Sequence, residues 1–327
     1  MGFRIDCLQY CNWSETVFRQ MRAGGLDAVH VTIAYHETFR ETVLRMEAWN
    51  ERFARHADLI APAGSAAEIR EIAASGRTAI VFGAQNPSPI EDDIGLVEIL
   101  YRLGLRIMQL SYNNQSLLAT GCYEAEDPGL TRMGRAVVAE MNRVGMVVDM
   151  SHSADRSTLE AMEVSSRPIA ITHANPASWH PARRNFSDDV LRALGASGGM
   201  LGLSLYPHHL KDGSDCTLQQ FCEGAAIAAE LVGAENLGIG SDLCQDQPDS
   251  VVEWMRTGRW TRAVDYGEGS AAAPGFPPQP DWFRDNRDFP GLAEGLRHAG
   301  FSAPEVDGIM GENWMRFFEA GFGPGAA

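Results

Sequence analysis

Short apolar runs alternate with amphipathic runs along most of the chain. Eight apolar runs are rich in β-branched and aliphatic residues and are bounded by turn residues, so they predict strands. These strands cover residues 3–9, 27–35, 78–86, 106–112, 146–151, 168–173, 199–205 and 236–242. Runs with helical periodicity lie between them, at 14–25, 36–57, 96–104, 131–145, 155–164, 187–196 and 217–232. Buried strands that alternate with helices are typical of a parallel sheet covered by helices.

Repeated β-α units of this kind predict an α/β fold, a closed (β/α)8 barrel of the TIM type, with an open doubly wound sheet as the alternative. Such a barrel needs roughly 250 residues or more, and the chain has 327. The segment 244–290 is rich in Gly, Pro and Ala and predicts a long loop. Helical periodicity returns at 305–322, and no linker interrupts the pattern. We therefore expect a single domain over residues 1–327 that ends in helical structure.

The charge balance excludes some classes of partner. The chain carries 27 Lys and Arg against 43 Asp and Glu, a net charge of −16 at pH 7. We therefore expect neither nucleic acid nor a membrane surface as a partner. The pattern shows no apolar run long enough for a transmembrane helix and no signal peptide. Six cysteines are dispersed along the chain, so reduced thiols and a cytoplasmic location are expected.

Polar residues lie at the carboxyl ends of several predicted strands. In a barrel enzyme the catalytic residues lie at these ends. His152 follows one strand, His173 ends the next, and Asp242 ends the last. A single histidine after a strand is more often a capping or surface residue. Two at equivalent positions, with an aspartate at a third, indicate a metal or catalytic site, because imidazoles and a carboxylate suit zinc. Zinc lowers the pKa of water, and Asp242 would then be a ligand, a proton acceptor, or both.

Four blocks of sequence resemble the membrane (renal) dipeptidases, which are binuclear zinc peptidases on an amidohydrolase-like TIM barrel. The blocks are GLTRMGRAVVAEMNRVGMVVDMSH (129–152), ITHANPASWHPARRNFSDDVLRAL (171–194), NLGIGSDL (236–243) and IMGENWMRFF (309–318). They occur in the family's order, and the resemblance covers most of the chain. It implies a barrel fold, a peptidase-like hydrolase activity and zinc as the cofactor.

The resemblance also implies roles for individual residues. His152 and His173 match the two histidines that bind the family's second zinc ion, and Asp242 matches its catalytic aspartate. Arg184 matches an arginine that holds the carboxylate of the substrate. The local sequence HPARRN is longer than the family's motif, so Arg183 is a competing candidate for the same role. A guanidinium suits that role because its planar fork pairs with a carboxylate.

The family's other metal ligands have no counterpart in this sequence. Leu8 and Tyr10 stand where the family has a His-x-Asp motif near its N-terminus. Gln85 stands in place of the glutamate that bridges the two ions; as a neutral amide it bridges metals poorly, so we expect it to contact substrate. Tyr112 stands in place of a histidine that polarises the scissile carbonyl. We therefore expect one metal ion per chain rather than two, zinc or another divalent metal, with no metal at all as the alternative.

Replacement ligands are available near the predicted mouth of the barrel. The loop after the strand 106–112 contains Cys122 and Glu124, and Cys7 and Cys11 flank the missing His-x-Asp motif. Of these, Glu124 is favoured as a ligand or as an acid/base group. Alternatively, Cys122 is simply a small buried residue, as most cysteines are.

The resulting prediction is a metal-dependent hydrolase that acts on a small amide or dipeptide-like substrate with a carboxylate. Asp242 would move the proton, Arg184 or Arg183 would hold the carboxylate, and Tyr112 or Asn86 would orient the carbonyl. The alternatives are an inactive barrel that binds a small organic acid, and lyase or isomerase chemistry at the altered site. By analogy with the family, whose members are usually dimers, we also expect a homodimer.

Overall fold

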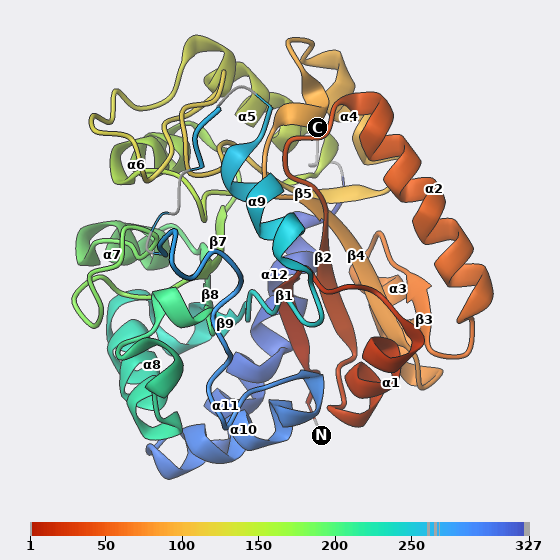
Figure 1. Cartoon of the computed structure of the whole chain (residues 1–327), viewed down its shortest axis with the longest axis vertical. Coiled ribbons are helices and arrows are strands. Elements are labelled where there is room, and N and C mark those ends of the chain that lie inside the picture. The colour runs from red at the N-terminus through yellow and green to blue at the C-terminus, as the bar shows by residue number, and fades with distance from the viewer. Residues whose placement is uncertain (1, 260–261, 265–266, 268, 324–327) are drawn as a thin grey trace.

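The computed structural model describes residues 2–259, 262–264, 267 and 269–323, and within them parallel strands close into a barrel (Figure 1). The ring contains β1 (Ile5–Gln9), β2 (Ala28–Ala34), β4 (Thr78–Ala84), β5 (Leu105–Gln109), β6 (Val147–Asp149), β7 (Ala170–Ala174), β8 (Met200–Leu203) and β9 (Leu237–Ile239). β2 pairs with β4 and β1 pairs with β9, which completes the ring. An open sheet would leave two unpaired edges. The predicted eight-stranded barrel is therefore confirmed, and the doubly wound alternative is wrong.

Each predicted strand is present but is shorter than predicted. β4, β5, β6, β8 and β9 end before the predicted carboxyl end, whereas β1 and β7 begin later than predicted. One further strand, β3 (Ile60–Pro62), pairs with the first half of β4. At three residues it is too short to produce a hydrophobic period. β5 takes the place of β3 beside β4 from Phe82 onward.

Helices form the outer layer of the barrel, and most of them match predicted ones. The matching helices are α1 (Glu15–Ala23), α2 (Phe39–Arg55), α4 (Gly95–Arg102), α5 (Arg132–Val144), α6 (Asp155–Val164), α7 (Asp188–Ala196) and α8 (Leu218–Val232). Local signals set their ends: the Thr131 side chain accepts from the Gly134 N–H at the start of α5, and Gly145 ends that helix with a φ of 85°. An additional helix, α3 (Ala66–Ala74), follows β3. No helix among the described residues has the length and apolar character needed to cross a membrane.

The C-terminal part of the chain contains α10 (Phe289–His298), α11 (Ala303–Met310) and α12 (Glu312–Gly321). The prediction of helical structure over 305–322 is therefore confirmed, as two helices, α11 and α12, rather than one continuous element. The break falls at Gly311, where a Cβ would lie 2.3 Å from the backbone oxygen of Phe3. The chain turns there because the segment before β1 passes too close to admit a side chain.

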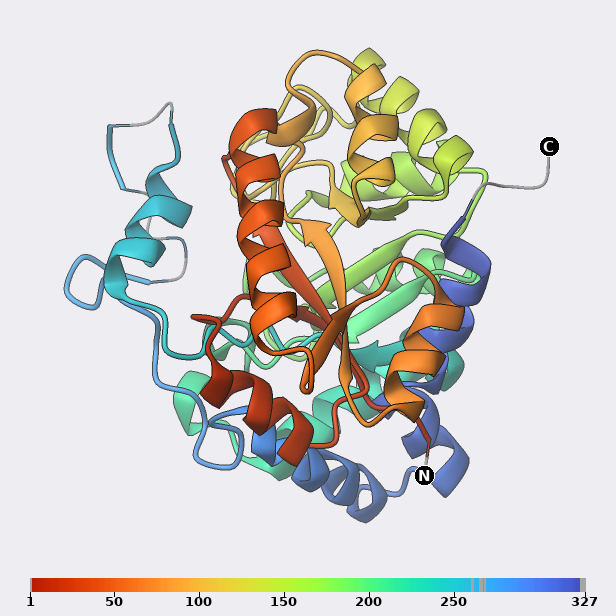
Figure 2. The same cartoon turned by 90° about the vertical axis from the view of Figure 1, so that its right-hand side faces the viewer.

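The predicted loop 244–290 contains a helix, α9 (Asp249–Thr257), which is a correction to the sequence-based expectation. α9 crosses in front of the strands in Figure 1 and lies outside the ring of helices in Figure 2. The helix has no side-chain N-cap hydrogen bond and lies in a segment rich in Gly and Pro, so its local signals are weak. Residues 260, 261, 265, 266 and 268 of the predicted loop lie outside the described residues.

Close approach of strands inside the barrel makes Gly240 sensitive to substitution. A Cβ at Gly240 would lie 1.7 Å from the backbone oxygen of Thr172, the residue before His173. We expect Gly240→Ala to lower the free energy of unfolding by about 1–3 kcal/mol, the usual cost of overpacking. Urea denaturation measures this change.

The control is Gly291→Ala in α10, where a Cβ would meet nothing within 4 Å. Alanine is the better helix former by about 1 kcal/mol, so this variant should be as stable as the wild type or more so. Equal stability of the two variants would contradict the close packing at Gly240.

Candidate active site

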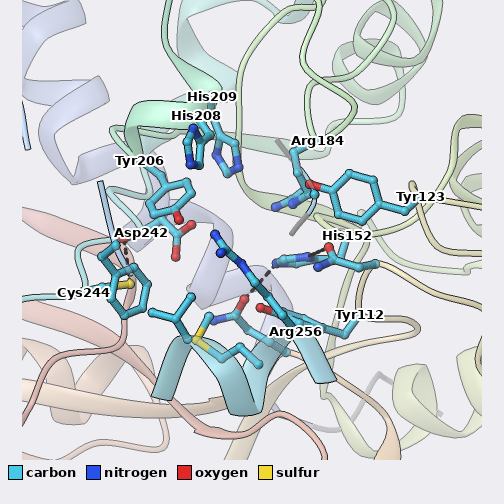
Figure 3. Close-up of a pocket in the computed structure, with 16 residues that line it drawn as sticks. Tyr112, Tyr123, His152, Arg184, Tyr206, His208, His209, Asp242, Cys244 and Arg256 are labelled. Atoms are coloured by element: carbon cyan, nitrogen blue, oxygen red, sulfur yellow. Dashed lines mark hydrogen bonds between the residues drawn. The ribbon is translucent and has the colours of Figure 1, made fainter. Parts of the chain in front are cut away.

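A narrow cavity of about 60 Å³ lies at the carboxyl ends of the strands, between the barrel and α9. Figure 3 shows the side chains that surround it. Gln85 follows β4, Tyr112 follows β5, His152 follows β6 and Asp242 follows β9, and all four line the cavity together with Arg184 from the loop after β7. Residues of α9 close the remaining side. The structure thus brings these five sequence-predicted side chains to one cavity.

His173 is fully buried and meets His152 deeper in the barrel. The Nε2 atoms of the two imidazoles are 3.0 Å apart. His152 Nδ1 lies 2.6 Å from the side-chain oxygen of Asn113, so this nitrogen is the protonated donor. Asn113 was not singled out in the sequence; its φ of 61° turns the chain so that its side chain faces the histidine.

The hydrogen bonds around Asp149 set the tautomer of His173. The Thr172 hydroxyl donates to Asp149 at 2.6 Å, so its oxygen is left to accept a hydrogen bond from His173 Nδ1 at 2.8 Å. Asp149 also accepts from the Ser151 hydroxyl at 2.5 Å and from the Gln109 amide at 2.9 Å. Both histidines therefore carry their proton on Nδ1 and present the lone pair of Nε2.

The two Nε2 lone pairs face each other in a way that fits a bound cation. Burial, and then the charge of Arg184, lower the pKa of both His152 and His173 well below the usual value, so both rings stay neutral. Gln85 Oε1, another electron-pair donor, lies 2.9 Å from His152 Nε2. Zn–N bonds of about 2.0–2.1 Å allow two nitrogens at this separation to share one ion. In the part of the chain that the structure describes, no group of three or more His, Cys, Asp or Glu side chains could hold a metal.

An aromatic cluster lies where the sequence resemblance would place the other metal ligands, around Tyr10 and Tyr112. Tyr10 packs edge-to-face on Tyr35 with ring centroids 4.8 Å apart, and Tyr35 packs in the same way on Tyr112 at 5.0 Å. Leu8 is fully buried in β1. The Gln85 amide donates to the Tyr35 hydroxyl at 2.9 Å, which turns its oxygen toward His152. Close packing of these rings leaves little space for a second ion.

Asp242 combines an unusual backbone conformation with a raised pKa. Its φ is 55°, in the left-handed region, and its N–H donates to the backbone oxygen of Leu8 at 3.1 Å. Burial raises the pKa of the carboxyl group from 3.8 to about 7, with Arg184 opposing and Asp6 adding to the rise. A carboxyl group that titrates near neutral pH suits a general acid/base.

The two candidate arginines have different positions. Arg184 is 3% exposed, lines the cavity, and donates to the backbone oxygens of Ser151 and His173. Its buried Nε has no hydrogen-bond partner among the described residues. Arg183 is exposed, stacks over the Tyr123 ring at 5.5 Å, and does not line the cavity. Of the two, the structure brings Arg184 to the site.

Other predicted site residues lie outside the cavity. Asn86 lines a neighbouring cleft, with its amide nitrogen 3.3 Å from His36 Nδ1. The Glu124 carboxylate accepts from the Gln115 N–H at 2.7 Å and so ties its own loop together. Cys7 and Cys11 are buried, and burial raises the pKa of both thiols well above its usual value, so they stay protonated. These positions do not support the predicted roles of Asn86 and Glu124 in catalysis or binding.

Cys122 lies beside the site but outside the cavity. Its N–H donates to the backbone oxygen of His152 at 3.0 Å, and its thiol lies 3.8 Å from the side-chain oxygen of Asn113. This position favours a role for Cys122 in holding His152 in place over a role as a metal ligand. Sequence reasoning missed Tyr206 and Arg256, which line the cavity; the only local signal for Tyr206 was its place after a strand.

The contacts of Asp149 lead to a testable expectation for the histidine pair. In Asp149→Asn an amide NH₂ would face hydroxyl and amide donors, so the Thr172 hydroxyl would turn and release His173. We expect metal affinity to fall roughly 10- to 100-fold, as for other groups that orient metal ligands, and unfolding free energy to fall by about 1–3 kcal/mol. Chelator competition and urea denaturation measure the two changes.

Asp189→Asn is the matched control, because the Asp189 side chain is 94% exposed on α7. This variant should behave as the wild type. Unchanged metal affinity in Asp149→Asn would show that Asp149 does not orient His173.

Comparison with known proteins identifies one matching family model, described as membrane dipeptidase (peptidase family M19), over residues 9–255. Dipeptidase verJ of Clonostachys rogersoniana is 31% identical over 215 residues, which is 65% of this chain and 55% of that protein. Dipeptidase tcpJ of Claviceps purpurea is 26% identical over 294 residues, 89% of this chain and 61% of that protein. The chain therefore spans little more than half the length of these curated relatives.

Solved structures show the same fold over the full chain. An amidohydrolase from Pseudomonas aeruginosa is 35% identical with a TM-score of 0.92, and the match covers 98% of this chain and 97% of that one. A metallopeptidase from Rhodobacter sphaeroides, liganded with a phosphinate mimic of the dipeptide L-Ala-D-Ala, is 18% identical with a TM-score of 0.80. That match covers 98% of this chain and all of the other, and at this identity it supports the fold alone.

Proposed function

Since the chain belongs to the membrane dipeptidase family, peptidase family M19, we propose that it is a metal-dependent hydrolase of small amides or dipeptide-like substrates that bear a carboxylate. The observation that carries this proposal is the pair of Nε2 lone pairs 3.0 Å apart at the carboxyl ends of the strands. Two neutral imidazoles in this arrangement repel each other unless a proton or a metal ion lies between them. The lowered pKa of both rings favours the metal ion.

We propose one zinc ion per chain, held by His152 and His173 with the Gln85 oxygen beside them. The packing of Tyr10 on Tyr35 supports a single ion, because these rings fill the region where the sequence resemblance would place the other ligands. Bound there, zinc would supply Lewis acidity that polarises a carbonyl and lowers the pKa of water.

The protein's own side chains have the following roles. Asp242 accepts a proton from the attacking water and returns it to the leaving amine, for which a pKa near 7 is suited. Arg184 binds the carboxylate of the substrate through its Nε–H, which has no other partner among the described residues.

Tyr112 donates a hydrogen bond to the scissile carbonyl oxygen. Burial raises the pKa of its phenol well above the usual value, so the hydroxyl keeps its proton. Its ring packs on the His152 ring with centroids 4.2 Å apart, which holds the hydroxyl at the cavity.

Elemental analysis joined to a hydrolysis assay tests the proposal. We expect about one zinc per chain, release of amino acids from glycylglycine, and loss of that activity with a chelator and its return with zinc. Metal-free protein that cleaves the dipeptide, or a protein that binds no divalent metal, would be evidence against the mechanism.

A second candidate is an inactive barrel that binds a small organic acid. The aromatic cluster of Tyr10, Tyr35 and Tyr112 favours it, since it replaces half of the family's metal site. Thermal shift separates the two: stabilisation by organic acids without stabilisation by any metal would support the binding protein. Lyase or isomerase chemistry would show as loss of substrate without hydrolysis products. The homodimer also remains a proposal, and light scattering of the purified chain tests it.

A further inference from the structure

A third buried imidazole, that of His209, reaches the cavity from the loop after β8. It ends a short 3₁₀ helix, Pro207–His209. Its side chain is 3% exposed and lines the cavity together with Arg184. Figure 3 shows His209 on the same side of the cavity as Arg184, away from Tyr112. His209 belongs neither to the histidine pair of the metal site nor to the catalytic groups of the proposed mechanism.

The backbone of His209 is fixed to the loop that carries Arg184. Its carbonyl oxygen accepts hydrogen bonds from the side-chain amides of Asn175 at 3.1 Å and Asn185 at 3.0 Å. Both asparagines are buried, and Asn185 is the residue after Arg184. The loops after β7 and β8 are therefore joined here, which holds His209 and Arg184 in a fixed relation to each other.

The hydrogen bonds of Ser204 set the tautomer of His209. The Ser204 side-chain oxygen accepts from the Tyr206 N–H at 3.3 Å and lies 2.7 Å from His209 Nδ1. Among the described residues this buried hydroxyl has no other acceptor for its proton, and an unsatisfied buried donor costs free energy. Ser204 therefore donates to His209 Nδ1, and Nε2 carries the proton of the ring.

The remaining nitrogen of His209 is a donor without an acceptor. Nε2 has no hydrogen-bond partner among the described residues but is not enclosed by them, so it faces the cavity that the ring lines. Burial, and then the charge of Arg184, lower the pKa of His209 well below the usual value, so the ring stays neutral. A buried N–H that lacks an acceptor in the protein is available to an oxygen of a ligand.

Arg184 supplies a second such N–H on this side of the cavity, since its Nε also lacks a partner among the described residues. A carboxylate has two oxygens, and each of them accepts hydrogen bonds. The guanidinium provides the opposite charge, and the neutral imidazole adds a directed bond without a second cation beside the first. The pair of donors therefore fits one carboxylate, while Tyr112 lies across the cavity.

We propose that His209 is a specificity-determining residue whose Nε2–H donates to one oxygen of the substrate's carboxylate, while the Nε–H of Arg184 donates to the other. The site then selects a free carboxylate over a carboxamide, because the NH₂ of an amide would face one of the two donors. This inference rests on the proposed function, in which Arg184 binds that carboxylate.

Binding of butyrate and butyramide tests the inference without any hydrolysis, because the two molecules have the same shape and differ in the carboxylate. By titration calorimetry of the purified chain, we expect His209→Phe to bind butyrate roughly 10- to 100-fold more weakly than the wild type, the range for a hydrogen bond to a charged group. Butyramide affinity should stay within about threefold, because its single carbonyl oxygen can still accept from Arg184.

His209→Gln and His180→Phe are the matched controls. Glutamine keeps an N–H donor close to the place of the imidazole Nε2, so butyrate affinity should stay within about fivefold of the wild type. His180 lies in the loop after β7, and its side chain does not line the cavity, so His180→Phe should bind butyrate as the wild type does. Equal loss in His209→Gln and His209→Phe would assign the effect to packing of the ring and overturn the role of the N–H.

Hydrolysis of glycylglycine separates failure of the inference from failure of the proposed function. We expect His209→Phe to raise KM roughly 10- to 100-fold with kcat within about threefold, because the lost bond is made in the ground state and the transition state alike. Butyrate binding that depends on His209, in a protein that cleaves no dipeptide, would sink the peptidase proposal and leave the inference standing. Unchanged butyrate affinity in His209→Phe, no binding of butyrate by the wild type, or a fall in kcat without a rise in KM would overturn the inference.

Discussion

Replacing His173 by alanine is expected to remove zinc from the purified protein and to lower kcat/KM for dipeptide hydrolysis by more than about 10²-fold. Changes in groups that only orient a metal ligand already cost roughly 10- to 100-fold, and this substitution removes the ligand itself. The remaining Nε2 of His152 and the Gln85 oxygen, 2.9 Å apart, would hold an ion weakly. Elemental analysis and a thermal melt with and without zinc measure the loss, and His152→Ala should behave in the same way.

His298→Ala is the control for this result, because His298 is exposed at the end of α10. It should keep the metal content and the activity of the wild type. A His173→Ala protein that retains wild-type zinc would place the metal elsewhere in the chain, and the lone-pair geometry would then need a different explanation.

Asp242→Asn is expected to lower kcat by roughly 10²- to 10⁴-fold, the range for loss of a general acid/base, while the zinc content stays unchanged. An amide has nearly the same shape as the carboxyl group but cannot accept the proton of the attacking water. Loss of metal along with activity would instead make Asp242 a ligand, which is the other role that the sequence left open.

The pKa of Asp242 also predicts how the activity of the wild type depends on pH. Burial raises this pKa to about 7, and the ionised form accepts the proton, so kcat/KM of the wild type should fall as the pH drops below 7. A bound cation shifts this limb to lower pH, and Asp242→Asn should lack it.

The same raised pKa predicts an effect on stability. A carboxyl group whose pKa is higher in the folded state stabilises the fold below its unfolded pKa of about 3.9, and this contribution is lost as the pH rises through about 7. Metal-free Asp242→Asn should therefore unfold at a higher temperature than the metal-free wild type at pH 8, and the gap should close toward pH 4. A variant that is less stable than the wild type at pH 8 would contradict the burial of a charged group here.

The barrel could be predicted because its signals are local. Burial on both faces makes each strand a continuous apolar run, and one buried face gives α5 its helical period. β3 escaped prediction because it has only three residues. α9 escaped because it begins at Asp249, after Pro248 and without a side-chain cap, inside a segment rich in Gly and Pro. The break at Gly311 escaped for a different reason, since its cause is a segment more than 300 residues earlier.

The candidate site could be predicted only in part. His152, Gln85 and Asp242 follow strands, and the carboxyl ends of parallel strands meet at one mouth, so their meeting follows from the fold. The choice between Arg183 and Arg184 depends on which of the two side chains the loop after β7 directs into the cavity. No local sequence pattern predicts this direction. Glu124 was favoured for its nearness in sequence to the mouth, yet it bonds to its own loop.

The sequence by itself determined the barrel, the family and the strand-end histidines, because hydrophobic period and motif order are properties of neighbouring residues. Only the tertiary structure decided what those histidines do. Their tautomers depend on Asn113 and Asp149, and their cavity is closed by α9, a helix that the sequence predicted as loop. These contacts join residues far apart in the chain, and their energies come from burial and hydrogen-bond direction, which exist only once the chain has folded.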